Sequence, residues 1–437
     1  MMNRRGRHMK SIGAVIAGSC CAFATSAAAA PSDEAAMREL ERQVSTLEAE
    51  ISALQASSGE GWLTDARAEE VRAIVQDVLA DADTRSSLLQ SGMTAGWDGK
   101  PFISSPDGNF KLAIGATLQV RYVYNLQDDG PDDDNRAGFE NRRTRLRFGG
   151  HVYDPSWQYF VQGDFGTTGT FRLLDGFIEK DFGEGWSIRV GKFILPFTRE
   201  LLTPHWKPLM VERSLAGNFF STGRSQGAMV GYESEMFRAW GAFSDGLGPL
   251  GGRTTPALTY DTEYAFTGRV EALLAGDWKQ FGDWTSFPNQ EYAIMVGGGA
   301  HYEVDEYGTA ALETETFRWT ADVGVEGGGW NIGASVFGNH ESTDGAPDVD
   351  QYGFFVQGGF FLTEELELIA RYEWADDDSD DDELSVVTAG VNWYMRGHNL
   401  KWTTDVGVGL NEVTSAFARS GGGWREDSAG QDGQIVF

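Results

Sequence analysis

Three arginines spaced two residues apart form the most chemically informative pattern in this chain. Arg143, Arg145 and Arg147 alternate with uncharged residues. Because neighbouring side chains of a β-strand point to opposite faces, a strand here would place the three guanidinium groups in one row. Such a row suits the solvated face of a soluble sheet, or the wet interior of a membrane barrel, where it would attract anions.

A locally basic segment follows at 193–225. Its charged residues are four basic and two acidic ones, namely Arg199, Glu200, Lys207, Glu212, Arg213 and Arg224. Cations in a narrow passage of low dielectric raise the local concentration of anions, and guanidinium forks match the oxygens of phosphate or carboxylate. The predicted pore-lining, anion-binding residues are therefore Arg143, Arg145, Arg147, Arg189, Arg199, Lys207 and Arg213. The alternative is that these cations pair with acids at 164, 175, 200 or 212 and only hold the segment in place.

No catalytic or metal-binding pattern accompanies these cations. The histidines beyond residue 30 lack metal-ligand spacing, and none belongs to a serine or cysteine triad motif. The acidic run 376–383 lacks the alternating ligands and turn glycine of an EF-hand loop. We interpret it as a solvated loop, with diffuse divalent-cation binding shared with lipopolysaccharide as the alternative. We predict no enzyme activity, no cofactor and no metal.

The first residues read as a secretion signal, predicted to span 1–29. Four basic residues precede an apolar run from Ile12 to Phe23, and small residues follow at 27–30. A lipoprotein signal ending at Cys20 is the weaker alternative. Both cysteines lie in this segment, so the mature chain would contain no disulfide.

Composition then excludes nucleic acid as a partner. Four of the 35 basic residues precede residue 30 and none of the 65 acidic ones does, so the mature chain would carry a net charge of −34. Phosphate backbones are bound mainly by cations. No stretch beyond the signal is long and apolar enough for a membrane helix. A large soluble β-protein and an outer-membrane barrel remain.

Two helical segments are predicted before the strands. The first, 30–58, carries an a/d seam of Met37, Leu40, Val44, Leu47, Ile51 and Leu54. A helix this short needs partners in water, so we predict an oligomerising coiled coil, with a lone amphipathic helix as the alternative. The second segment, 59–95, would pack on the coiled coil or plug the following domain.

From about residue 96 to 437 the apolar period becomes that of strands. We predict about sixteen, beginning near 110, 141, 157, 171, 185, 227, 236, 263, 291, 315, 329, 351, 365, 384, 399 and 431. Alternation is clean in several, as in Leu366, Leu368, Ala370, Tyr372 and Trp374. Aromatic residues near strand ends, assigned to interfacial girdles, are Trp157, Trp186, Trp330, Tyr394 and Trp402.

The connections between these strands favour a membrane barrel. Those after odd-numbered strands are mostly long and acidic, and those after even-numbered strands are mostly tight. Two depart from the rule, a short connection near 167 and a long turn at 275–290. Outer-membrane barrels have long outside loops and short periplasmic turns, whereas a soluble sandwich has no reason to alternate in this way. The predicted fold is an all-β transmembrane barrel preceded by a coiled coil.

Several ordered motifs resemble the phosphate-selective porin O and P family. They are 105–112 leading into 118–121, the arginine run at 143–147, 159–165, 174–177, 189–200 and 211–214. The resemblance implies a trimeric, sixteen-stranded porin passing anions through a narrowed pore whose wall carries an arginine ladder, matched here by Arg143, Arg145 and Arg147. The family's phosphate-selecting lysine cluster has no evident counterpart.

The sequence thus predicts an outer-membrane porin for passive diffusion of small, phosphate-like anions. It would lie in a Gram-negative-type outer membrane among lipids and lipopolysaccharide, with its N-terminal helices in the periplasm, where the coiled coil could contact the cell wall. The alternatives are a general nutrient porin and an envelope tether anchored by the barrel. Preferred solute, pore diameter, strand count and oligomer number stay open, as does whether the helices plug or tether.

Overall fold

The computed structural model describes most of the chain beyond residue 91. The described residues are 19–22, seven single positions between 42 and 73, and 92–126, 136–166, 169–247, 261–307, 312–379, 383–411, 413–420 and 433–436. Residues 1–24 and 114–437 form one compact unit, and residues 25–113 form a second. No helix in the described part is long and apolar enough to cross a membrane.

The smaller unit contains a short hairpin. Strands β2 (Thr94–Trp97) and β3 (Pro101–Ser104) pair antiparallel, and β3 pairs with residues 111–113. The seven single described positions before it are helical. All six seam residues of the predicted coiled coil lie outside the described residues, as does most of the second helical segment. Both helical segments therefore stay predictions.

Seventeen strands of the described residues belong to the larger unit. One is β1 (Ser19–Ala22), within the segment predicted to leave with the signal peptide. The other sixteen are β4 (Lys111–Leu126), β5 (Arg136–His151), β6 (Trp157–Asp164), β7 (Arg172–Gly183), β8 (Trp186–Ile194), β9 (Arg224–Glu233), β10 (Phe237–Ser244), β11 (Asp261–Ala275), β12 (Ala293–Tyr307), β13 (Leu312–Gly327), β14 (Trp330–Thr343), β15 (Val349–Phe361), β16 (Leu366–Asp376), β17 (Leu384–His398), β18 (Leu400–Gly409) and β19 (Gly433–Val436). Each matches one predicted strand.

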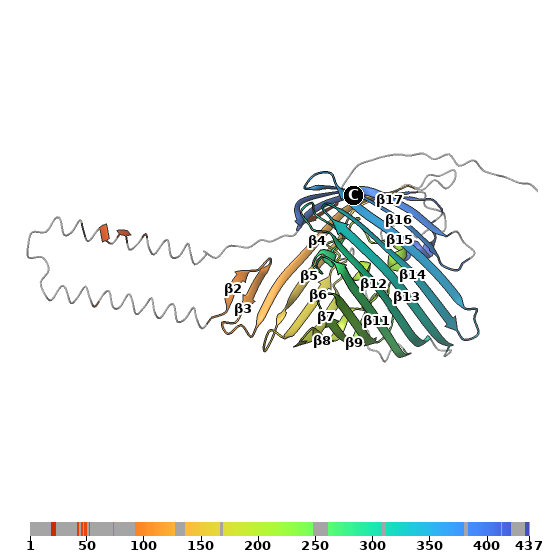
Figure 1. Cartoon of the computed structure of the whole chain (residues 1–437), viewed down its shortest axis with the longest axis horizontal. Coiled ribbons are helices and arrows are strands. Elements are labelled where there is room, and N and C mark those ends of the chain that lie inside the picture. The colour runs from red at the N-terminus through yellow and green to blue at the C-terminus, as the bar shows by residue number, and fades with distance from the viewer. Residues whose placement is uncertain are drawn as a thin grey trace, which may run out of the picture. The chain divides into compact units, whose positions relative to one another are not determined.

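These strands form an antiparallel sheet in which chain neighbours are sheet neighbours. Pairing runs without interruption from β5 to β18. Strand β5 lies beside β4, where the Tyr122 and Phe139 rings are 4.8 Å apart. Both β1 and β19 pair with β18 and with β4. Figure 1 shows β11–β17 side by side in one curved sheet. Closure of the sheet into a barrel stays a prediction.

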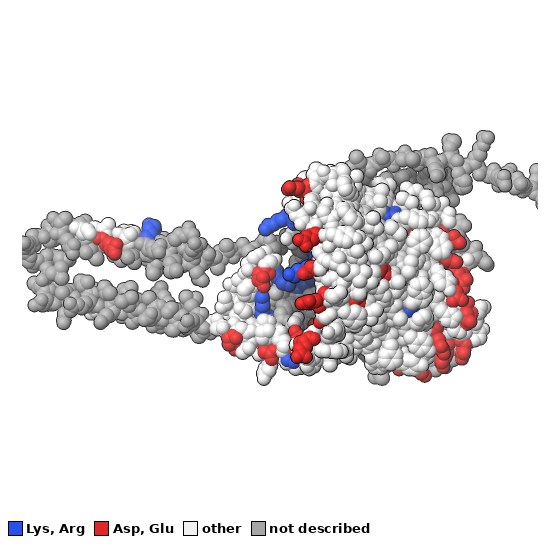
Figure 2. Space-filling model, viewed as in Figure 1, with Lys and Arg blue, Asp and Glu red and all other residues white. Residues whose placement is uncertain are grey.

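Side chains alternate between a buried and an exposed face, as the sequence pattern predicts. On β16, Glu367 and Glu373 are at most 1% exposed, whereas Leu368 and Tyr372 are 44% and 37% exposed. On β11, Arg269 is 1% exposed, whereas the next residue, Val270, is 51% exposed. Figure 2 shows the outer face of β11–β17 as a surface with few charges, bordered along one edge by acidic residues. An apolar outer face beside an inner face rich in charge is the reverse of a soluble sheet.

One aromatic residue assigned to the outer girdle lies inside instead. Tyr394 is 3% exposed and its hydroxyl donates to Glu367 at 2.8 Å. Its ring also packs against Phe287 and Phe361. The assignment was wrong because position near a strand end does not fix the face, and here the phenol reaches a buried carboxylate.

The largest apolar cluster lies on the inner face of β14–β17. Wall residues such as Phe337, Phe355 and Ile369 pack against side chains of α4 (Leu215–Phe219) and α5 (Ser415–Ser420). Two helices from different connections therefore cover one part of the inner wall. Burial of apolar area, at roughly 25 cal/mol per Å², is the main force that holds them there.

Candidate functional site

The connection between β8 and β9 folds back against the inner wall. We call residues 195–223 the inner loop; it contains α3 (Arg199–Leu202) and α4. The side chains of Thr198 and Ser214 cap the two helices by accepting backbone N–H bonds. Leu195, Phe197 and Leu209 are at most 1% exposed. The loop is therefore packed like a core element and not like a free surface loop.

Five wall residues bind the backbone of the inner loop between 208 and 212. Lys401 donates to Pro208 O (2.7 Å), Asn392 to Leu209 O (2.9 Å), Gln119 to Val211 O (3.4 Å) and Arg371 to Glu212 O (3.1 Å), while Asp405 accepts from Val211 N (2.8 Å). These contacts come from β4 and from β16–β18. The path of this segment is thus fixed by main-chain bonds, whatever its side chains do.

Three arginines converge on the carboxylate of Glu212. Arg121 of β4 lies 3.0 Å from it, and Arg142 and Arg143 of β5 lie 2.8 and 2.6 Å from it. Arg121 also pairs with Glu140. Burial by itself would raise the pKa of the Glu212 carboxyl group, but Arg142, Arg143 and Arg121 together hold that pKa well below its ordinary value. The carboxylate therefore remains ionised and bound.

The other two arginines of the predicted row have different partners. Arg145 pairs with Asp164 at 2.8 Å. The guanidinium of Arg147 lies 3.7 Å from the ring centroid of Trp206, and its Nη2 donates to a backbone carbonyl of β4. The row shares the inner face of β5, as the alternation predicts, with its cations directed to a carboxylate of the loop, a carboxylate of the wall and an indole.

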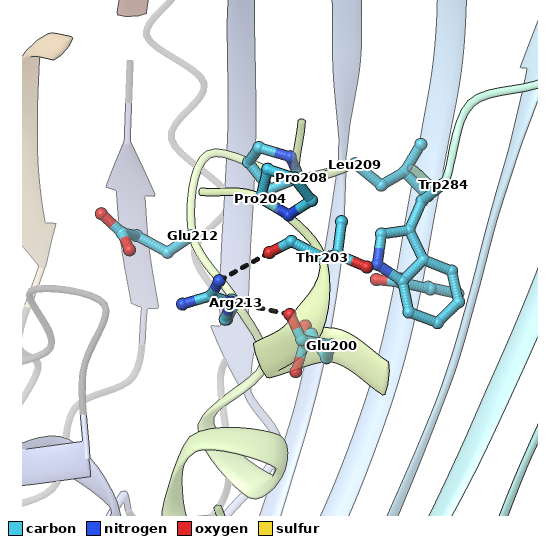
Figure 3. Close-up of a pocket in the computed structure, with 9 residues that line it drawn as sticks. Glu200, Thr203, Pro204, Pro208, Leu209, Glu212, Arg213 and Trp284 are labelled. Carbon is cyan, nitrogen blue, oxygen red and sulfur yellow. Dashed lines mark hydrogen bonds between the residues drawn. The ribbon is translucent and has the colours of Figure 1, made fainter. Parts of the chain in front are cut away.

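Arg213 acts as an internal brace of the inner loop. Its guanidinium donates to the carbonyls of Glu200, Leu201 and Thr203 at 2.8–3.2 Å. Figure 3 shows the contacts of Arg213 with Thr203 and Glu200, and shows Glu212 and Trp284 on opposite sides of Thr203. The lining residues enclose a cavity of about 10 Å³, room for roughly one water molecule.

The long turn between β11 and β12 meets the inner loop. This inward turn, residues 276–292, places Trp284 3% exposed against the loop. Arg199 stacks over the Trp284 ring at 3.8 Å, and its Nη2 donates to Asp283 O at 3.2 Å. Lys207 pairs with the Asp283 carboxylate at 3.0 Å. A side chain at Gly324 would collide with the Arg199 guanidinium, so glycine on β13 permits this close approach.

Arg189 faces a larger cavity beside the loop. It pairs with Glu179 at 2.6 Å. Together with Arg199 and Arg238 it lines a cavity of about 280 Å³ whose other walls are largely apolar or aromatic. Two predicted site residues, Arg189 and Arg199, therefore line one cavity, whereas Arg143 and Arg213 do not line it.

The model of the family "Phosphate-selective porin O and P" matches residues 114–408. The chain belongs to this porin family. The match begins within β4 and ends within β18, so it spans nearly the whole sheet and includes the inner loop.

Solved porins share the fold at low sequence identity. An anion-selective porin from Comamonas acidovorans is 12% identical, covers 74% of this chain and 96% of its own, and has a TM-score of 0.53. OmpT of Vibrio cholerae is 13% identical, covers 75% of this chain and 95% of its own, and has a TM-score of 0.48.

A relative was also found by sequence. An uncharacterized protein of Aquifex aeolicus is 20% identical over 335 residues, which are 68% of this chain and 71% of that protein.

Sequence reasoning missed several cations of this porin that contact the inner loop. Arg121 and Arg142 were outside the predicted set, although Arg121 lies in a motif that carries the family resemblance and Arg142 directly precedes another. Arg142 is adjacent to Arg143, which faces inward, so the alternation of side chains along β5 assigns Arg142 to the outer face. From the sequence, the inward turn stood out only because it is longer than the other connections after even-numbered strands, and its contact with the inner loop was not predicted. Within the described residues, no group of three or more His, Cys, Asp or Glu side chains could hold a metal ion.

Proposed function

We propose that this porin is an outer-membrane channel for passive diffusion of small anions. The observation that carries the proposal is the inner face of β4 and β5, where four guanidinium groups gather beside the inner loop. We propose that this loop narrows the pore. The sheet would close into a barrel of sixteen strands with its apolar outer face toward lipid. Anions would follow the cationic wall down their own gradient.

Membership of this porin family supports a channel rather than an enzyme. Arg143, Arg145, Arg147, Arg189, Arg199, Lys207 and Arg213 are the proposed anion-attracting set. Each has an acidic, aromatic or carbonyl partner, so their part in transport is to set a positive field with exchangeable contacts. Phosphate-like oxyanions fit guanidinium forks best.

Reversal potential across a planar bilayer under a salt gradient tests this proposal. We expect an anion-selective reversal, and block of chloride current by submillimolar phosphate if oxyanions are preferred. A cation-selective reversal would contradict the proposal outright.

A general nutrient porin is the second candidate, favoured by the same ion pairs. When carboxylates neutralise the wall arginines, the field left for anions is smaller, and neutral solutes pass as readily. Liposome-swelling rates separate the two: equal rates for neutral sugars and for organic anions of the same size would favour the general porin.

Further proposals concern the domain boundaries, the oligomeric state and the segments before the sheet. We propose a signal peptide at 1–29, a coiled coil at 30–58, a second helical segment at 59–95 and the porin domain at 96–437. The porin would be a homotrimer in contact with lipopolysaccharide, with periplasmic helices that could reach the cell wall. Deletion of 31–95 tests the tether: trimers and conductance should survive while cell-wall attachment is lost.

A further inference from the structure

The carboxylate of Glu212 occupies a position among arginines that a free anion would also fit. Its carboxylate meets three guanidinium groups from two neighbouring strands. Arg143 contacts both of its oxygens, with Nη1 to Oε1 at 3.0 Å and Nη2 to Oε2 at 2.6 Å. This two-pronged contact is the one by which arginine holds the oxygens of phosphate or a free carboxylate.

The ratio of guanidinium groups to carboxylates at Glu212 is the reverse of that at another buried ionic cluster on the inner wall. At Arg269 of β11, two carboxylates, Asp322 and Glu271, surround one guanidinium. At Glu212, three guanidinium groups share one carboxylate, and Glu140 adds a second acid at the edge of the cluster. Removal of the Glu212 charge would raise the cluster from a net charge of +1 to +2.

The carboxylate is not needed to place the loop. Main-chain bonds from β4 and from β16–β18 fix the segment 208–212 without using any loop side chain. The carboxylate therefore contributes charge to a position that the backbone already determines. Arg142 is 28% exposed at its side chain, so the cluster is not fully enclosed.

We propose that Arg121, Arg142 and Arg143 form an oxyanion site that Glu212 occupies as a tethered competitor. An oxyanion with two or more oxygens, such as phosphate or sulfate, would displace the Glu212 carboxylate from the forks. Chloride has a single centre and cannot span them. Glu212 thus sets how strongly the channel prefers oxyanions over chloride. This inference rests on the proposed anion channel and adds a specificity-determining residue to it.

Glu212→Gln in the full-length porin is the test, with inorganic phosphate and sulfate as probes. We expect the phosphate concentration that halves the chloride current to fall at least tenfold and the reversal potential to become more anion-selective. Asp344→Asn is the matched control, because it removes one exposed charge in an outside turn and should leave both readings unchanged. The double variant Glu212→Gln/Arg142→Gln should return most of the way to the wild-type reading.

A loosened loop would give a different result. Asn392→Ala removes the tether to Leu209 O together with the bonds of Asn392 to Glu367 and Thr403 on the wall, and should raise single-channel conductance without a gain in phosphate block. If Glu212→Gln behaves like Asn392→Ala, or if its phosphate block equals that of the wild type, the inference is overturned. Should Glu212→Gln fail to insert, Glu212→Asp keeps the charge on a shorter arm and should lower the blocking concentration at least threefold. A cation-selective wild type would instead refute the proposed function, independently of the variant.

Discussion

The inner loop is bound to two parts of the sheet by opposite kinds of chemistry. Toward β4 and β5 it offers one carboxylate to three arginines. Toward β14–β17 it offers aliphatic and aromatic side chains, among them Phe220, which stacks on Phe337 with an interplanar angle of 10°. The ionic part can exchange its partner for a solute, whereas the apolar part cannot. Apolar packing thus anchors the loop on one side, and on the other side its carboxylate holds an ionic contact that a solute could take over.

The largest expected effect is on the apolar side. Phe220→Ala removes a side chain that is 1% exposed and should cost about 3–5 kcal/mol of loop docking, because a buried cavity replaces the ring. Hydrogen exchange of residues 215–223 in detergent should rise strongly and channel current should become noisy. Phe182→Ala, at an exposed ring on β7, is the control. Unchanged exchange in Phe220→Ala would mean that apolar packing does not anchor the loop.

A smaller effect is expected on the ionic wall. Asp164→Asn leaves Arg145, whose side chain is 12% exposed, without its carboxylate and should cost about 2 kcal/mol. The thermal midpoint of the porin in detergent measures this. A cost equal to that of Phe220→Ala would erase the distinction between the two walls.

The inward turn should matter less again. Asp283→Asn removes the partner of Lys207, whose side chain is 30% exposed, and should cost about 1 kcal/mol because water screens the pair. Amine-reactive labelling of Lys207, followed by mass spectrometry, should become faster. An unchanged labelling rate would show that Asp283 does not restrain this lysine.

The smallest effect concerns pH. The folded pKa of Glu212 lies well below its ordinary value of 4.5, so its ion pairs contribute fully above that value and weaken only as pH falls through the lowered pKa. Between pH 8 and pH 5, titration of Glu212 should therefore contribute no change in selectivity. Reversal potentials of wild type and Glu212→Gln should differ by a constant amount across this range. A difference that disappears near pH 5 would contradict the shifted pKa.

The strands could be predicted from sequence because a period of two is a local property. All sixteen predicted strands are present, and the arginine row shares one face of β5. The partners could not be predicted, because pairing depends on residues far apart in the chain. Glu212 meets Arg143 across 69 positions, and nothing local distinguishes it from Glu200, which instead binds Ser214 inside the loop.

The apolar inner wall was also beyond local reasoning. Alternation predicts which residues face inward but not whether water or a helix covers them. Phe355 and Ile369 are buried because α4 and α5 arrive from other connections. Tyr394 was misassigned because a position near a strand end does not fix the face of the side chain, and the carboxylate that its hydroxyl reaches lies on the neighbouring strand.

The main-chain tethers of the inner loop join positions that are distant along the chain. Val211 and Asp405 are 194 residues apart, and Pro208 and Lys401 are 193 apart. Such non-local contacts carry an entropic cost, because the long chain segment between the two residues must first be closed into a loop. The final path of the segment 208–212 therefore depends on contacts with β16–β18, which follow it by more than 150 residues in the chain. Before these three strands are in place, the segment 208–212 lacks four of the five wall contacts that hold it.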